Sequence, residues 1–134
     1  MYTDIKNFLP SNILFFNEPL KKHTTFRIGG AADLLVTPQN EEQLIKLFKY
    51  IKENCIRYVI IGNGSNLLFS DEGYRGIVVK IGSELSSIEA IPCENGMIIN
   101  AGAGTLLSKL ALFACENSLT GLEFASGIPG NVGG

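Results

Sequence analysis

A short strand, an amphipathic helix and a second apolar strand follow one another between residues 32 and 61, and this order constrains the fold most. Ala32–Thr37 is an apolar run that ends at Pro38. Tyr58–Ile61 is a continuous apolar run, a pattern typical of a strand that is buried on both faces. Because a helix connects the two runs, the sequence predicts two neighbouring parallel strands with a crossover helix.

The helix itself is predicted from Glu41 to about Asn54. Asn40 is a suitable N-cap, and Glu41 and Glu42 fall in the first turn, where negative charge is favourable. Its apolar side chains recur at helical spacing. They are Leu44, Leu47, Phe48, Ile51 and Cys55.

The second half of the chain has a different pattern. A strand is predicted over residues 76–81, and a β-hairpin over residues 87–91 and 97–101, because Asn95 and Gly96 form a turn signal between two apolar runs. Thr105 is the expected cap of a helix that runs to about Asn117. Its predicted buried side consists of Leu106, Leu107, Leu110, Ala111, Phe113 and Ala114.

These elements predict an α+β protein with two lobes. Residues 1–20 are expected to be an irregular arm or a short strand. Residues 21–82 form a small strand–helix–strand lobe, and residues 83–134 form a mainly antiparallel lobe that is incomplete at its C-terminal end. The division near Gly82 follows a shift in composition.

The loop Gly62–Asn66 comes directly after a predicted buried strand, and two glycines among small polar residues favour a backbone nest for a phosphate or pyrophosphate. A Rossmann fingerprint is excluded, because Leu67 occupies the place of its third glycine and Gly73 and Gly76 leave no room for a long helix. A P-loop is excluded because no Gly-Lys-Ser/Thr follows. A plain strand-to-turn connection stays open as an alternative.

Two further stretches are rich in glycine. The segment Ser126–Gly134 contains four glycines and a proline in nine residues, and Gly102–Gly104 follows another apolar run. Backbone without a Cβ atom allows a ligand to approach closely. The three stretches are predicted to line one cleft, although three unrelated turns would give the same pattern.

Composition excludes several classes of function. A net charge of −2 gives no bulk attraction to nucleic acid or to an anionic membrane. No metal site is predicted, because the three cysteines lack metal-site spacing and His23 is the single histidine. The cysteines are expected to be buried free thiols in a reducing compartment. They are Cys55, Cys93 and Cys115. His23 follows Lys21 and Lys22 and is expected in a solvated surface run, with a phosphate-contacting basic cluster as the alternative. No signal peptide or membrane span is predicted, so the expected location is the cytoplasm.

Three stretches together carry a resemblance. "TTFRIGGAADLLVTP", "VIIGNGSNLLFSDEGYRGIVVKI" and "AGAGTLLSKLALFACENSLTGLEFASGIPGNVGG", in this order and spacing, resemble the UDP-N-acetylenolpyruvoylglucosamine reductase family over residues 20–134. That family belongs to the flavoprotein superfamily of vanillyl-alcohol oxidase and para-cresol methylhydroxylase. The resemblance implies FAD, bound non-covalently between two lobes, with the first glycine loop around its pyrophosphate.

The loops and the resemblance together give a set of expected cofactor-binding residues. They are Ile61, Gly62, Asn63, Gly64, Ser65, Asn66, Leu67, Gly102, Ala125, Ser126, Gly127, Ile128, Gly130, Asn131, Gly133 and Gly134. The family's catalytic arginine, serine and glutamate match no residue of this chain and are expected after Gly134. The chain is therefore expected to be a C-terminally truncated enzyme without its substrate-binding domain, and to be inactive alone.

The activity implied is part of peptidoglycan synthesis, which serves cell wall biogenesis, cell shape and cell division. NADPH reduces FAD, and the flavin passes a hydride to UDP-GlcNAc-enolpyruvate to give UDP-N-acetylmuramate. The alternatives are the FAD-binding part of another oxidoreductase of the superfamily, or a nucleotide-binding module without catalysis.

Three further expectations follow from the same sequence. Gly64→Val is expected to block a ligand while both lobes still fold. The segment 127–134 is expected to be mobile and unpacked, so that FAD binding by this chain alone is weak or absent. An exposed edge of the second lobe is expected to favour self-association of the fragment.

Overall fold

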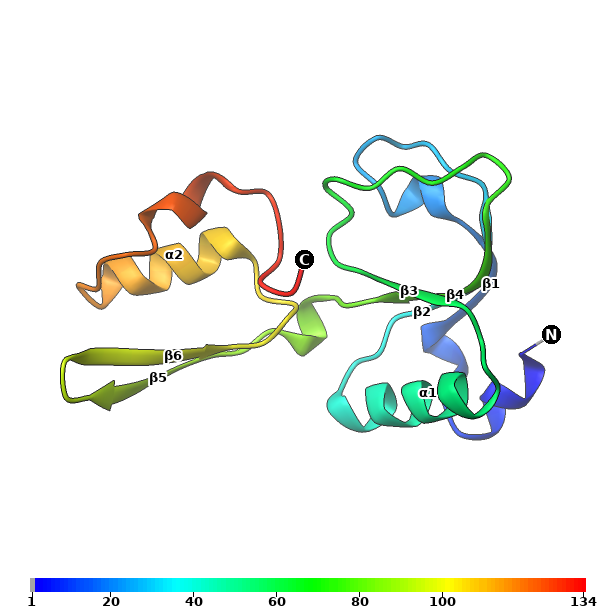
Figure 1. The fold of residues 1–134 in the computed structure, drawn as a ribbon, viewed down its shortest axis with the longest axis horizontal. Coiled ribbons are helices and arrows are strands. Elements are labelled where there is room, and N and C mark those ends of the chain that lie inside the picture. The colour runs from blue at the N-terminus through cyan, green and yellow to red at the C-terminus, as the bar shows by residue number, and fades with distance from the viewer. Residues whose placement is uncertain (1) are drawn as a thin grey trace.

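The protein consists of a four-stranded sheet and a separate two-stranded hairpin, each with its own helix (Figure 1). The computed structural model describes residues 2–134. The lobe built on the four-stranded sheet is called lobe 1 below, and the lobe built on the hairpin is called lobe 2. The α+β class and the two-lobed arrangement agree with the sequence prediction.

Lobe 1 contains β1 (Leu14–Pro19), β2 (Ala31–Val36), β3 (Tyr58–Ile61) and β4 (Tyr74–Lys80), with α1 (Glu41–Glu53) between β2 and β3. The sheet order is β1-β2-β4-β3. β1 is antiparallel to β2, and β2 and β3 each lie parallel to β4. The first twenty residues thus contribute an edge strand, preceded by two short 3₁₀-helices.

The position of β3 corrects two predictions. β2 and β3 are parallel, but they are not neighbours, because β4 lies between them. β3 is also not buried on both faces, since Tyr58 is 46% exposed and Ile60 is 51% exposed. The apolar run Ile77–Val79 of β4 is fully buried and occupies the centre of the sheet. Both runs are apolar, so composition alone did not distinguish the edge strand from the central one.

Both faces of this sheet are covered. Ile77 and Val79 face α1 and the N-terminal segment, where they join one core cluster. Val78 points to the opposite face and joins a second cluster with Leu20 and Ile61. The loops over residues 20–30 and 62–73 cover this second face, opposite α1 in the view of Figure 1. The glycine loop 62–66 is therefore part of the layer that closes lobe 1.

α1 begins as predicted, because the Asn40 side chain accepts a hydrogen bond of 2.9 Å from the backbone N–H of Gln43. Leu47 and Ile51 form its buried face. Cys55 does not continue that face, since it lies beyond the helix end, has a φ of 50° and is exposed. Cys93 and Cys115 are exposed as well, so the prediction of three buried thiols is wrong.

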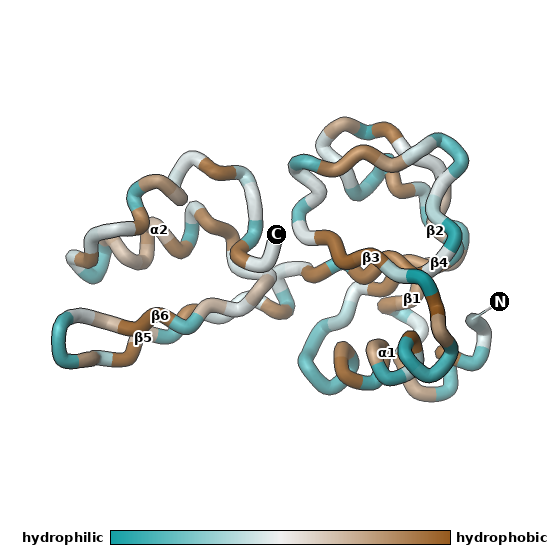
Figure 2. Tube along the Cα trace, viewed as in Figure 1, coloured by the Kyte–Doolittle hydropathy of each residue, from teal (hydrophilic) through white to brown (hydrophobic). Residues whose placement is uncertain are grey.

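Lobe 2 contains β5 (Ile88–Cys93), β6 (Gly96–Ala101) and α2 (Leu107–Glu116), followed by a 3₁₀-helix at Glu123–Gly127. The predicted hairpin is confirmed, with Cys93 paired to Gly96 across the turn. Figure 2 shows that apolar residues also run along the hairpin, and Ile98 on β6 is 53% exposed. Within the described residues, no helix is long and apolar enough to cross a membrane.

Thr105 does not cap α2, which corrects another prediction. The N-cap is Leu106, and no side chain caps the helix. The buried Thr105 hydroxyl instead accepts a hydrogen bond of 3.2 Å from the backbone N–H of Ser87 and donates one of 3.1 Å to the carbonyl of the same residue. Thr105 therefore joins the start of the hairpin to the entry of α2. This contact spans 18 residues of chain, so a local cap pattern cannot reveal it.

Candidate functional site

The predicted glycine-rich stretches meet where the two lobes join. A cavity of about 320 Å³ at this junction is lined by Ile61 and Gly62 from lobe 1 and by Ala103, Gly133 and Gly134 from lobe 2. Its remaining lining is apolar and consists of Leu44, Phe48, Ile60 and Ile81. Four of the residues expected at a cofactor site therefore share one cavity, although they lie about 70 residues apart in the sequence.

The C-terminal segment is packed against lobe 2. The backbone N–H of Val132 donates to the carbonyl of Thr105 at 2.8 Å, and that of Gly133 donates to the carbonyl of Ala103 at 3.0 Å. The side-chain amide of Asn131 donates to the carbonyl of Gly104 at 2.7 Å. The expectation that this segment is unpacked is therefore wrong for residues 131–133, because the turn 103–105 holds it in place.

Asn131 carries an unsatisfied polar atom at the junction. Its side chain is only 7% exposed, and its Oδ1 atom has no hydrogen-bond partner among the described residues. The donor to Gly104 is fixed by the carbonyl there, so Oδ1 must face away, toward Gly62. A buried acceptor without a donor costs free energy. A ligand N–H or hydroxyl group placed between the lobes would satisfy it.

Gly64 serves the fold of lobe 1 itself. It has a φ of +69°, and a Cβ atom there would overlap the backbone carbonyl oxygen of His23. The Gly64 carbonyl also accepts a hydrogen bond of 3.0 Å from the N–H of Thr25. The loop 62–66 is thus built directly on the "TTFRIGG" stretch. Gly64→Val would disturb this packing, so the expectation that the variant folds normally does not fit the structure.

The remaining expected residues fall into two groups. Gly102 and Ala125 pack against other parts of the protein. A Cβ atom at Gly102 would overlap the carbonyl of Leu85, and Ala125 is fully buried. The other group is exposed or half-buried and does not line the cavity at the junction. It consists of Asn63, Ser65, Asn66, Leu67, Ser126, Gly127, Ile128 and Gly130. Gly127 has open space around it, with no atom within 4 Å of an added Cβ.

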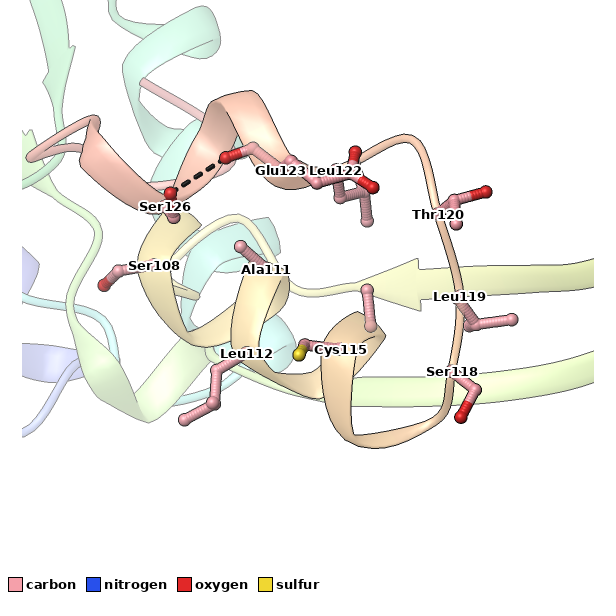
Figure 3. Close-up of a pocket in the computed structure, with 11 residues that line it drawn as sticks. Ser108, Ala111, Leu112, Cys115, Ser118, Leu119, Thr120, Leu122, Glu123 and Ser126 are labelled. Carbon is pink, nitrogen blue, oxygen red and sulfur yellow. Dashed lines mark hydrogen bonds between the residues drawn. The ribbon is translucent and has the colours of Figure 1, made fainter.

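A larger groove of about 610 Å³ lies on lobe 2, between α2 and residues 118–126 (Figure 3). Its lining is mostly apolar, with Leu112 and Leu122 among the side chains drawn. The ionisable side chains of this lining are Cys115 and Glu123, and a carboxylate repels phosphate groups. Ser126 is the one expected residue that reaches it. We therefore place the candidate nucleotide site at the junction.

Glu18, His23 and Lys80 form a cluster beside the loop 62–66 that was not predicted from the sequence. The Nε2 atom of His23 lies 3.1 Å from a carboxylate oxygen of Glu18, and its Nδ1 atom lies 3.2 Å from the ammonium nitrogen of Lys80. Its side chain is 17% exposed, so His23 does not belong to a solvated run as expected. Residues 18, 23 and 80 come together only through the sheet, and no spacing in the sequence signals this.

Glu18 is held in its ionised form by this cluster. Partial burial by itself would raise the pKa of its carboxyl group, but the hydrogen bonds from His23 and Lys22 outweigh burial and lower the pKa below 4.5. Lys22 lies 3.4 Å from the same oxygen and is mostly exposed. The cluster therefore has its negative charge at one end and Lys80 at the other.

The comparison with known families decides the class of protein. The family described as FAD binding domain matches residues 32–134. The chain belongs to this FAD-binding family. The match covers β2 to the C-terminal segment, so it includes both glycine loops at the junction. These loops are thus parts of an FAD-binding domain, and they lie where its two lobes meet.

Named relatives of this FAD-binding domain agree with one another. The UDP-N-acetylenolpyruvoylglucosamine reductase of Desulforamulus reducens is 45% identical over 100% of this chain and 44% of its own length. The enzyme of the same name from Clostridioides difficile is also 45% identical, over 100% of this chain and 43% of its own. The chain thus spans less than half the length of these relatives.

A solved structure shows the same fold. UDP-N-acetylenolpyruvylglucosamine reductase (MurB) from Thermus caldophilus is similar with a TM-score of 0.65 and 36% sequence identity. The similarity covers 90% of this chain and 39% of that protein. The two-lobed α+β architecture is therefore shared with a part of that enzyme.

Proposed function

We propose that these 134 residues form the FAD-binding part of a reductase that converts UDP-GlcNAc-enolpyruvate to UDP-N-acetylmuramate for the bacterial cell wall. The observation that carries the proposal is the meeting of two glycine segments at one interlobe cavity, within a chain whose relatives bear the reductase name. NADPH is the proposed reductant. FAD supplies the hydride-transfer chemistry when it is bound.

The residues at the junction fit such a cofactor. The loop 62–66 is anchored to lobe 1, because the Gly64 carbonyl accepts a hydrogen bond from the N–H of Thr25. The backbone N–H groups of this loop would bind a diphosphate as a nest does. The cavity between Phe48, Ile81 and Ala103 offers apolar surface of the kind that a flavin or adenine ring contacts. The free Oδ1 of Asn131 lies beside Gly62 and would accept a hydrogen bond from a polar edge of the ligand.

We also propose that this part of the enzyme does not carry out the reaction alone. The chain covers 44% of the length of the Desulforamulus relative. We expect the catalytic arginine, serine and glutamate of the family to follow Gly134. The 134 residues of this chain contribute the binding and orientation of FAD. Protonation of the substrate carbon is assigned to the region that this chain does not include.

Purified protein titrated with FAD tests the proposal, with flavin fluorescence as the signal. We expect saturable binding of FAD, because residues 131–133 are already in place and little chain remains to be ordered. With NADPH and UDP-GlcNAc-enolpyruvate added, we expect no substrate-dependent oxidation of NADPH. Absence of FAD binding would refute the assignment of the site, and turnover at the rate of a full-length reductase would refute the division of labour.

A further inference from the structure

Lys80 is a partly buried cation that no carboxylate neutralises. Among the described residues, no carboxylate oxygen lies within 4.0 Å of its ammonium group, and its hydrogen bond goes to the imidazole Nδ1 of His23 at 3.2 Å. Removing a charge from water without a counter-charge is costly. An uncancelled positive charge in a protein of net charge −2 therefore points to a particular anion at this place.

The strand register places Lys80 beside the first glycine loop. Lys80 pairs with Ile61, the residue directly before Gly62, and the N–H of Ile81 donates to the carbonyl of Ile61 at 2.8 Å. Val78, two residues earlier in β4, faces the loop-covered side of the sheet, so the side chain of Lys80 emerges on that side as well. The backbone carbonyl of its partner His23 lies against Gly64.

His23 positions the ammonium group of Lys80. Because an ammonium only donates hydrogen bonds, the Nδ1 atom of His23 must be an acceptor, which assigns the proton to Nε2. Nε2–H then donates to Glu18, and Glu18 receives a further charged contact from Lys22. The imidazole ring thereby separates the carboxylate from Lys80. Two N–H donors of Lys80 stay available to another acceptor.

We propose that Lys80, held by His23 and Glu18, is an anion-binding residue that contacts the diphosphate of the cofactor beside the loop 62–66. The inference rests on the proposed FAD function and adds to it a charged side chain that the glycine motifs do not contain. Backbone N–H groups of a nest supply only partial charges. A diphosphate carries full negative charges, and a lysine placed next to the nest supplies the opposing charge.

Titrations of three proteins with three ligands test this role. Lys80→Met removes the charge and keeps the aliphatic stem, whereas Lys22→Met removes an exposed lysine that contacts the same Glu18 and serves as the matched control. The ligands are FAD, riboflavin, which lacks phosphate, and inorganic pyrophosphate. We expect Lys80→Met to weaken FAD and pyrophosphate binding by about tenfold or more, since it removes a charge-assisted hydrogen bond.

Riboflavin separates a local charge effect from damage to the site. We expect riboflavin binding to be unchanged in Lys80→Met, and all three affinities to be unchanged in Lys22→Met. Circular dichroism melts show whether each variant is folded. Lys80→Arg keeps the charge and is expected to retain most of the FAD affinity. It takes the place of Lys80→Met in the comparison if Lys80→Met does not fold. His23→Ala leaves Lys80 unpositioned and is expected to weaken pyrophosphate binding less than Lys80→Met does.

The results test the role of Lys80 and the assignment of FAD separately. Equal FAD and pyrophosphate affinities in Lys80→Met and Lys22→Met overturn the role of Lys80 and leave the FAD assignment standing. Pyrophosphate binding that depends on Lys80, without any FAD binding, leaves the anion site standing and refutes the FAD assignment. Wild-type protein that binds neither ligand refutes both. Equal losses for riboflavin and FAD in folded Lys80→Met would show a structural role and overturn the inference.

Discussion

Adding one methyl group at Gly64 and at Gly127 separates the glycines that the fold needs from those that a ligand needs. At Gly64 the backbone has a φ of +69°, and an added Cβ overlaps the carbonyl oxygen of His23. Forcing an L-residue into left-handed backbone costs about 1–2 kcal/mol. Losing the hydrogen bond between Thr25 and Gly64 costs about 0.5–1.5 kcal/mol more. Gly64→Ala should therefore lower the free energy of unfolding by about 2–3 kcal/mol.

Urea unfolding followed by circular dichroism measures this loss. With a slope of about 1–3 kcal/mol per molar urea, the midpoint should fall by about 0.7–3 M. Gly127→Ala is the matched control, because no atom lies within 4 Å of its added Cβ. Its free energy of unfolding should stay within about 0.5 kcal/mol of the wild-type value, while its affinity for FAD falls. A wild-type midpoint for Gly64→Ala would refute the reasoning about the loop, and unchanged FAD affinity for Gly127→Ala would remove that glycine from the site.

Two further variants test contacts of lobe 2 and of the charged cluster. Thr105→Val removes both hydrogen bonds to Ser87 and should destabilise the protein by about 1–2 kcal/mol in urea unfolding, whereas an unchanged midpoint would show that the contact is dispensable. Glu18 has a pKa below 4.5 in the folded protein, so its carboxylate stabilises the fold above pH 4.5 and loses this effect as the pH falls through the folded pKa. The stability difference between wild type and Glu18→Gln should therefore shrink on acidification, and a difference that is constant with pH would contradict the interpretation.

Local patterns predicted the elements of this fold well. The cap at Asn40, the periodicity of α1 and the turn between β5 and β6 depend on residues close in the sequence, and the structure has all three features. The order of the strands does not follow from such patterns. β4 lies in the centre because Ile77–Val79 is covered on both faces, and that cover comes from α1 on one face and from distant loops on the other.

The candidate site shows the same division. The glycine stretches were visible in the sequence, but their roles were not. Gly64 packs on His23 and Gly102 packs on Leu85, whereas no atom lies within 4 Å of a Cβ added at Gly127. Composition gives no means of telling these cases apart. The contact between Lys80 and His23 joins residues 57 positions apart, and it exists because β4 ends next to the loop that covers it. Such a contact requires the tertiary structure.

Amide chemical shifts recorded during an FAD titration show whether the two glycine segments at the lobe junction bind FAD. Signals of residues 61–66 and 127–134 should shift together and saturate at the same FAD concentration, because both segments border one site. Shifts confined to α2 and residues 118–126, which border the larger groove of Figure 3, would contradict the account.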